Sequence, residues 1–299
     1  MKSLENNIYL YGMILMTNSF LMENDYPEAD TYGEIKEKYH LPGGETGTCA
    51  TVLSSLGCDV KIDGTHMGTN TYPGIEKFYS DKSVDISSLN FDKQYAGIED
   101  YVIIGKNTRT PLGTFEKFFA DDVKRWNSPN ENDIIEADAA GIDPFFQDQS
   151  EEAARLCRKH GKPYVVIDCP FDSELHKYSA INILSDEFIR PYYKDADRIK
   201  LFKEYQNNTD GLTIFTYGAR PLMYGRKGEE IKFFEPFKIN PVSTLGAGDT
   251  FKAGCVYALL NGMDDYETVR FASAAAASAC MSFPLPLNPP TLTKINEFL

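Results

Sequence analysis

The sequence predicts an α/β protein with a doubly wound, mostly parallel β-sheet covered by helices, together with a small second sheet. From residue 137 to 216, short apolar segments rich in β-branched residues alternate with helix-like segments, which is the pattern of parallel βαβ units. Two earlier stretches, 18–41 and 101–115, have instead the character of exposed strands around loops. We therefore expect two sheets of different kinds.

Each element is predicted from its local pattern. The strands of the large sheet are expected at 8–15, 59–63, 137–142, 164–168, 179–184 and 211–216, and two further strands at 101–104 and 110–115 flank a turn at 106–108. Helices are expected at 48–56, 72–80, 150–160, 250–260 and 266–281. Glycine after the first of them, Asn261-Gly262 after the fourth and a run of prolines from Pro284 are typical helix ends.

The composition limits the classes of partner. The chain has 299 residues, with 30 Lys and Arg against 44 Asp and Glu, which gives a formal net charge of −14. So acidic a protein is poorly suited to bind nucleic acid or an anionic membrane. It would also repel a nucleotide, so a phosphate site has to be locally electropositive or bridged by Mg²⁺.

The cysteines and the hydropathy indicate a cytoplasmic protein. The six cysteines are scattered through mostly apolar segments and form no C-x-x-C pair, so we expect buried thiols in a reducing compartment. The four histidines are far apart in sequence, which argues against a zinc site. No segment has the pattern of a signal peptide or a membrane span.

The most informative stretch is 241–254, in which Gly246, Ala247 and Gly248 lead into Asp249 and then into a helix. A glycine-rich turn that opens a helix directs backbone amides and the positive end of the helix dipole at one point, which suits a phosphate or a developing anion. A carboxylate would repel phosphate there, so Asp249 suggests a general base acting on an attacking hydroxyl. The alternative is that Asp249 only caps the helix.

This stretch, Ser-Thr-Leu-Gly-Ala-Gly-Asp-Thr-Phe-Lys-Ala-Gly from 243 to 254, resembles the C-terminal signature of the ribokinase (PfkB-type) family of sugar and nucleoside kinases. The resemblance extends over nearly the whole chain. It implies a large α/β domain formed by 1–15, 42–94 and 118–299, and a β-sheet lid formed by 16–41 and 95–117. It also implies ATP and Mg²⁺ as cofactors, with a monovalent cation as a further candidate, and a homodimer through the lid as a candidate assembly.

The family resemblance also places substrate-binding residues near the N-terminus. Gly43 and Gly44 match the N-terminal signature, in which glycines let backbone amides contact sugar hydroxyls. Thr48 stands where the family usually carries Asn, and Thr17 and Asn18 occupy the region of a usual acidic residue. Both departures remove hydroxyl-binding groups, so they bear on the identity of the substrate.

Five further residues are assigned by resemblance. Arg109 is similar to an Arg often found in the lid, from which it would reach a phosphate or an acidic substrate. Asn182 lies where the family has Asn-x-x-Glu, whose acid orders Mg²⁺ through water; the spacing is shifted here, and Glu187 is the nearest acid. Thr216 and Gly218 resemble a Thr-x-Gly that contacts nucleotide phosphates.

The sequence therefore predicts an ATP-dependent kinase that phosphorylates a hydroxyl of a sugar or sugar-like compound. Asp249 would be the base and part of the substrate site, and the amides of Gly246, Ala247 and Gly248 would stabilise the moving phosphoryl group. One alternative is a nucleoside or vitamin kinase with the same chemistry. A second is a non-catalytic sensor of nucleotide or sugar, against which the carboxylate in the anion site argues.

Overall fold

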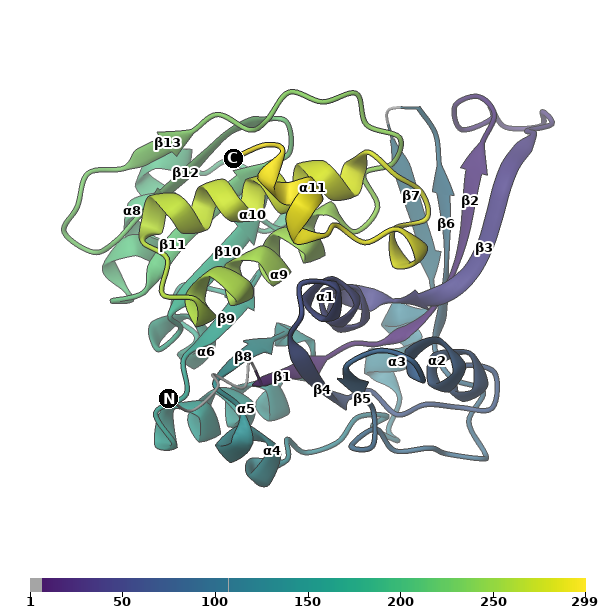
Figure 1. Ribbon diagram of the computed structural model, residues 1–299, viewed down its shortest axis with the longest axis horizontal. Coiled ribbons are helices and arrows are strands. Elements are labelled where there is room, and N and C mark those ends of the chain that lie inside the picture. Colours follow the sequence, from purple (N-terminus) through teal and green to yellow (C-terminus); the bar gives the residue numbers. More distant parts are fainter. Residues whose placement is uncertain (1–6, 107) are drawn as a thin grey trace.

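The computed structural model describes residues 7–106 and 108–299, which form a nine-stranded sheet with helices and a separate four-stranded sheet (Figure 1). The strands are β1 (Asn7–Gly12), β2 (Leu15–Met22), β3 (Ile35–Gly43), β4 (Asp59–Gly64), β5 (Val84–Asp85), β6 (Glu99–Ile104), β7 (Arg109–Gly113), β8 (Ala139–Ile142), β9 (Tyr164–Ile167), β10 (Ile181–Ser185), β11 (Leu212–Tyr217), β12 (Arg220–Gly225) and β13 (Lys232–Phe234). The α-helices are α1 (Gly44–Ser55), α2 (Tyr72–Tyr79), α3 (Phe115–Ala120), α4 (Glu131–Glu136), α5 (Asp148–Lys159), α6 (Glu174–Lys177), α7 (Asp186–Tyr192), α8 (Arg198–Asn207), α9 (Ala247–Leu260), α10 (Asp265–Cys280) and α11 (Leu292–Asn296).

The large sheet has the strand order β13-β12-β11-β10-β9-β8-β1-β4-β5. All pairs from β5 to β11 are parallel, and β12 and β13 continue the sheet as antiparallel strands. The order reverses direction at β1, which lies between β8 and β4. This mostly parallel, doubly wound sheet confirms the predicted fold class.

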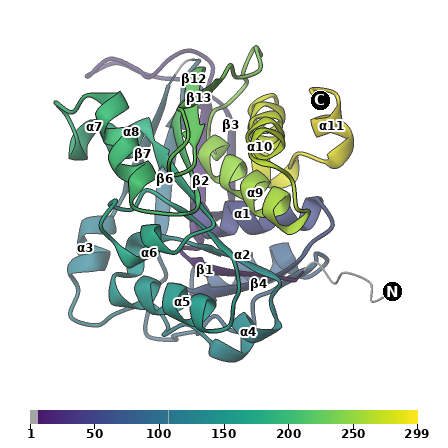
Figure 2. The ribbon, with the colours of Figure 1, turned by 90° about the vertical axis from the view of Figure 1, so that its left-hand side faces the viewer.

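Alternate side chains of β1 face opposite layers, as expected for a strand in a sheet covered on both faces. Ile8 and Leu10 are buried in a cluster with residues of α1, α9 and α10. Tyr9 and Tyr11 belong to a second cluster with residues of α4 and α5. Figure 2 shows these two groups of helices on either side of the sheet.

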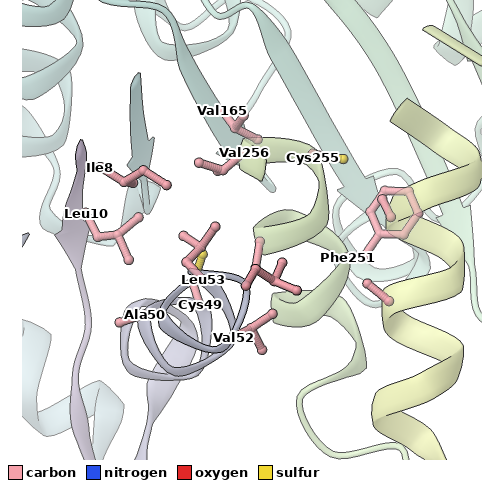
Figure 3. Packing of buried hydrophobic residues seen from close by; sticks show 14 of the residues in the cluster. Ile8, Leu10, Cys49, Ala50, Val52, Leu53, Val165, Phe251, Cys255 and Val256 are labelled. Carbon is pink, nitrogen blue, oxygen red and sulfur yellow. The ribbon is translucent and has the colours of Figure 1, made fainter. Parts of the chain in front are cut away.

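The packing of α9 determines where its first turn lies. Figure 3 shows side chains of α1 and α9 meeting next to those of β1 and β9. On its other side α9 lies against α10, where a Cβ added to Gly254 would lie 2.7 Å from the Cα of Ala272. Such close contact on two sides fixes the direction of α9 and thereby the position of Gly246–Asp249.

The small sheet has the order β3-β2-β6-β7 and draws its strands from the two stretches expected to form exposed strands. Its central pair, β2 and β6, is parallel, whereas β3 and β7 pair with them in antiparallel fashion. Leu15 at the start of β2 pairs with Gly43 at the end of β3. Because α1 begins at Gly44, the base of the small sheet lies directly against the start of α1.

The expected first strand, 8–15, is wrong as a single element. β1 ends at Gly12, and β2 starts at Leu15 in the other sheet. The amide of Met13 donates to Oδ2 of Asp143 (3.1 Å) and that of Ile14 to Oγ1 of Thr65 (3.1 Å). Side chains thus satisfy the backbone between the two strands, and the chain leaves the large sheet without burying unpaired amides.

Other differences are smaller. The strand expected at 110–115 ends at Gly113, and Phe115 begins α3; the turn residue Asn107 lies outside the described residues. The hairpin of β12 and β13 and the helices α4, α6, α7, α8 and α11 were not predicted. All six cysteines are buried and unpaired, as expected. Within 7–106 and 108–299, no helix is long and apolar enough to span a membrane.

Candidate active site

A cavity of about 640 Å³ lies between the small sheet, the first turns of α1 and α9, and the carboxyl ends of β9 and β10. Its lining includes eight residues singled out by the sequence: Gly43, Gly44, Thr48, Arg109, Glu187, Gly246, Gly248 and Asp249. The carboxyl edge of an open parallel sheet is where α/β proteins bind ligands. The fold therefore brings together, at a typical ligand-binding edge, residues as far apart in sequence as 43 and 249.

The start of α9 has the backbone geometry of an anion site. Gly246, the residue before the helix, has a φ of 80°, and a Cβ there would lie 3.0 Å from a methyl group of Leu285. The amide of Ala247 donates to the carbonyl of Thr244 (3.3 Å), so it is already shared. Gly248 lines the cavity and has open space where a Cβ would be. An anion would therefore meet the unpaired amides of this first turn.

Asp249 is the third residue of α9 and lines the cavity. The residue before the helix is Gly246, so Asp249 is not its N-cap. Burial and, to a smaller extent, the charge of Asp143 raise the pKa of its carboxyl to about 6, although the positive charges of Lys252 and Arg109 act in the opposite direction. At pH 7 such a carboxyl is ionised and is a stronger base than an ordinary aspartate.

Two glycines let α1 begin against the small sheet. Gly44 has a φ of 77°, and a Cβ there would lie 2.6 Å from the carbonyl oxygen of Met13. A Cβ on Gly43 would lie 2.1 Å from Oγ1 of Thr17. Larger residues would push the start of α1 away from β2, so both glycines set the shape of this end of the cavity.

Two further residues of α1 face the same cavity. Thr48 is buried, and its methyl group lies 3.2 Å from the position of a Cβ on Gly246, so α1 and α9 touch at their N-terminal ends. Glu45 was not predicted as a site residue, but it lines the cavity. Burial, together with the charges of Asp143 and Asp249, raises the pKa of Glu45 well above its usual value.

A buried ion pair lies close to this carboxylate cluster. Lys252, three residues after Asp249 on α9, forms a salt bridge with Asp143, and both side chains are almost completely buried. Oδ2 of Asp143 also accepts hydrogen bonds from Oγ1 of Thr46 (2.7 Å) and the amide of Met13 (3.1 Å). One carboxylate therefore connects α9, α1 and the link between β1 and β2.

The carboxyl ends of β9 and β10 add a second acidic group. Asp168, directly after β9, accepts hydrogen bonds from the amide (2.7 Å) and the hydroxyl (2.8 Å) of Ser185. Burial raises its pKa to about 6. Asp168 also has a φ of 51°, which is unusual for a residue other than glycine and often occurs at functional sites.

Glu187 and Arg109, assigned separately by the sequence, are bonded to each other. Nη2 of Arg109 on β7 donates to Oε2 of Glu187 on α7 over 2.8 Å, and the two side chains are 35% and 66% exposed. The small sheet is thereby linked to the large domain. Across 7–106 and 108–299, no group of three or more His, Cys, Asp or Glu side chains is placed to hold a metal ion.

Three predicted nucleotide-binding residues do not line the cavity. Asn182 is fully buried, and its amide nitrogen is bonded to Nδ1 of His176 (2.7 Å). It is the second residue of β10, and its side chain lies in the core and does not reach the cavity. Thr216 lies at the end of β11, beside Ser185 in register. Gly218 follows in a turn with a φ of 64° and open space around it.

A second cavity, of about 600 Å³, opens next to Asp63, His66 and Trp126. Its polar lining is internally bonded: Asn127 donates to Oδ1 of Asp63 (2.8 Å), and His66 lies 3.0 Å from Oδ1 of Asn127. None of the predicted site residues lines it. The carboxylates and helix-start amides that could act on a phosphate meet in the first cavity.

Sequence reasoning missed several of the residues around that cavity: Glu45, Asp100, Asp143, Asp168 and Lys252. Two of them carried a signal: Asp143 directly follows the strand predicted at 137–142, and Asp168 ends the strand predicted at 164–168, and the carboxyl ends of parallel strands meet at one edge of a sheet. Glu45 directly follows the glycines of the turn. Lys252 gave no signal, since a lysine in a helix is ordinarily solvated.

Comparisons with known proteins agree with this geometry. The model of the pfkB family carbohydrate kinases matches residues 7–283. A ribokinase of Bacillus subtilis is 36% identical over 276 residues, covering 87% of this chain and 88% of the relative. A 5-dehydro-2-deoxygluconokinase of Clostridium perfringens is 24% identical over 314 residues, covering 92% and 89%.

The solved structures point to the same fold. An Arabidopsis thaliana ribokinase complexed with ribose and ATP superposes with a TM-score of 0.79 at 16% identity, covering 98% of both chains. At that identity the likeness shows the fold, while the family match over residues 7–283 shows the lineage. The chain therefore belongs to the pfkB family of carbohydrate kinases and is a phosphotransferase that acts on an alcohol group.

Proposed function

We propose that this chain transfers the γ-phosphoryl group of ATP to a hydroxyl of a sugar or sugar-like compound, with Asp249 as the general base. The observation that carries the proposal is the place of Asp249, within the cavity and in the first turn of α9. A carboxylate there would weaken the binding of phosphate at rest. It is well placed to take the proton of an attacking hydroxyl as phosphate arrives.

The start of α9 would then stabilise the group in transfer. Amides of Gly246, Ala247 and Gly248 and the helix dipole would offset the negative charge that spreads over its oxygens. The amide of Ala247 is shared with Thr244, so we expect its contribution to be the smallest. Little covalent chemistry is needed from the protein beyond the base and this anion hole.

The two substrates would lie on opposite sides of Asp249, the acceptor in the cavity and the nucleotide partly beyond its described lining. Gly43, Gly44 and Thr48 line the end next to α1 and the small sheet, where we place the acceptor sugar. Thr216 and Gly218 lie at the carboxyl ends of the strands beyond β10, where we place the nucleotide. Asn182 is left out of this assignment because its side chain is buried against His176.

Mg²⁺ fits the donors at the nucleotide end. Asp168 and Glu187 offer carboxylate oxygens, the ligand type that Mg²⁺ prefers, and both line the cavity. Few protein ligands are needed, because Mg²⁺ usually keeps several waters and binds substrate phosphates. When bound, it would offset phosphate charge in a protein with a net charge of −14. A monovalent cation remains a prediction.

The small sheet is proposed to act as a lid, with 16–41 and 95–117 moving against a large domain formed by 1–15, 42–94 and 118–299. In support, Arg109 of the small sheet reaches Glu187 of the large domain. Closure over substrate would exclude water and limit wasteful hydrolysis of ATP. A homodimer through the lid also remains a prediction; Tyr101 and Leu112, paired in register, are both exposed there.

A screen for acceptor-dependent release of ADP tests the proposal. Purified protein is given ATP, Mg²⁺ and panels of sugars, polyols, nucleosides and vitamins, and the products are identified by mass spectrometry. We expect ADP and one phosphorylated compound with a member of the sugar or polyol panel. Turnover of a nucleoside or vitamin alone would favour the alternative acceptor, and sugar binding without any ADP would contradict catalysis.

A further inference from the structure

Asp100 is a carboxylate in the cavity that the proposed chemistry does not use. It lies on β6 of the small sheet and lines the cavity. Its Oδ1 is buried and has no hydrogen-bond partner among the described residues. Buried polar atoms in proteins are nearly always paired, because leaving one unpaired costs free energy. An unpaired carboxylate oxygen at a binding cavity therefore calls for a partner that binds there.

The sheet places Asp100 at the acceptor end of the cavity. Asp100 pairs in register with Thr17 on the neighbouring strand β2, and the hydroxyl of Thr17 lies against Gly43 at the start of α1. Asp100 supplies a carboxylate to the same region from the next strand.

The charged side chains that line the cavity are mostly negative. The described residues that line the cavity include five carboxylates, those of Glu45, Asp100, Asp168, Glu187 and Asp249, and one cation, Arg109. Arg109 lies opposite Ile104, four residues along β6 from Asp100, and is bonded to Glu187. Its guanidinium is thus already paired with a carboxylate, and an anionic acceptor beside Asp100 would meet more repulsion than attraction.

Burial raises the pKa of the Asp100 carboxyl to about 6. At pH 8 the group is therefore ionised and can only accept hydrogen bonds. A compound with two adjacent hydroxyl groups would donate to both oxygens, which are stronger acceptors when charged. A carboxylate or phosphate on the compound has no proton to donate at that pH.

We propose that Asp100 binds the acceptor directly and that this acceptor is a polyhydroxylated compound without a carboxylate or phosphate of its own. The inference rests on the proposed function, because it assigns the substrate class of the same cavity. It adds a specificity-determining residue and excludes sugar acids and sugar phosphates as preferred acceptors.

The test compares aldoses with their aldonates, which carry a carboxylate at C1. Binding of D-ribose against D-ribonate and of D-glucose against D-gluconate is measured by calorimetry at pH 8, in wild type and in Asp100→Asn. The matched control is Glu99→Gln, which removes the same charge from the adjacent position of β6; Glu99 is bonded to His40 (3.0 Å) and does not line the cavity.

We expect wild type to bind an aldose and to bind its aldonate at least about 10-fold more weakly. In Asp100→Asn the Kd of the aldose should rise by about 10- to 100-fold, since a charged acceptor for substrate hydroxyls is lost. The aldose-to-aldonate preference should shrink in the same variant, because the repulsion is lost too. Glu99→Gln should keep the wild-type Kd of the aldose and the wild-type preference for the aldose over the aldonate.

Thermal unfolding at pH 8 separates loss of binding from loss of structure. Asp100→Asn should melt no lower than wild type, because it removes a buried charge whose Oδ1 has no hydrogen-bond partner among the described residues. Three results would overturn the inference: no binding of either aldose, tighter binding of the aldonates, or an unchanged aldose Kd in folded Asp100→Asn. Aldose binding that depends on Asp100 but yields no ADP would instead refute the kinase proposal and leave this inference standing.

Discussion

Two ion pairs lie at or near the candidate site and differ in their burial and in the elements that they join. Lys252 on α9 and Asp143, directly after β8, have 1% and 0% of their side chains exposed. Arg109 and Glu187 join the small sheet to α7 with 35% and 66% exposed. The first pair is tied into α1 and the link after β1 by further hydrogen bonds. The second connects two parts of the molecule that we propose to move.

The difference shows how burial sets the role of a charge pair. Charges removed from water cost free energy unless they stay paired, so the buried pair fixes the position of the groups it joins. An exposed pair contributes little to stability and can open and close at low cost. We therefore expect the Lys252–Asp143 pair to hold its part of the site rigidly. We expect the Arg109–Glu187 pair to break and re-form as the small sheet moves.

The largest expected effect on stability comes from breaking the buried pair. Lys252→Met leaves the carboxylate of Asp143 buried without its cation, and the free energy of unfolding should fall by about 3–5 kcal/mol. Urea unfolding measures this value. The double variant Lys252→Met, Asp143→Asn should recover part of the loss, because Asn leaves no uncompensated charge. A loss below about 1 kcal/mol in the single variant would show that this ion pair does not hold α9, α1 and the link after β1 in place.

A smaller effect is expected from Glu187. We predict that Glu187→Gln raises the Mg²⁺ concentration needed for half-maximal rate and lowers kcat, by about 10- to 100-fold in all, with little change in the sugar KM. Arg109→Met provides the control, because it breaks the same salt bridge and leaves the carboxylate in place. Equal Mg²⁺ titrations for Glu187→Gln and wild type would mean that Glu187 serves only to hold Arg109.

The smallest effect is expected on stability at the exposed pair. Arg109→Met should change the free energy of unfolding by less than about 1 kcal/mol, since exposed ion pairs contribute little. Its effect should appear in hydrogen exchange, as weaker substrate-induced protection of 16–41 and 95–117. Protection that is the same with and without saturating sugar in wild type would argue against a closing lid.

The fold was largely predictable from local patterns. The strands of the large sheet are short β-branched runs, and the ends of α9 and α10 carry clear glycine and proline signals. The break between β1 and β2 was not predictable. It depends on Asp143 and Thr65, which are distant in sequence and accept hydrogen bonds from the amides of Met13 and Ile14. Local pattern contains no information on such long-range partners.

The site was predictable where a motif fixes backbone geometry, as at Gly43, Gly44 and Gly246. The site was less predictable where a residue's role depends on the direction in which its side chain points. Asn182 was assigned by its place in a shifted motif, yet its side chain faces the core. Glu45 and Lys252 each look like ordinary solvated charges in the sequence, and only the packing of α1 against α9 brings them together beside Asp249.

The central claim, that Asp249 is the base, is tested most directly by the kinetics of Asp249→Asn on the best acceptor from the screen. We predict that kcat falls by about 10²- to 10⁴-fold while the Kd for ATP is retained, because the amide has a similar shape but cannot accept the proton. Asp210→Asn, which alters a 98% exposed side chain, is the matched control.

Thermal unfolding of Asp249→Asn and wild type gives an independent readout. The raised pKa of Asp249 means that its contribution to stability is present below about pH 4 and is lost as pH rises through about 6. Asp249→Asn should therefore melt above wild type at pH 8, and the gap should close toward pH 4. A folded Asp249→Asn that is nearly inactive and more stable at pH 8 is the predicted result, and one that keeps a wild-type kcat would contradict the account.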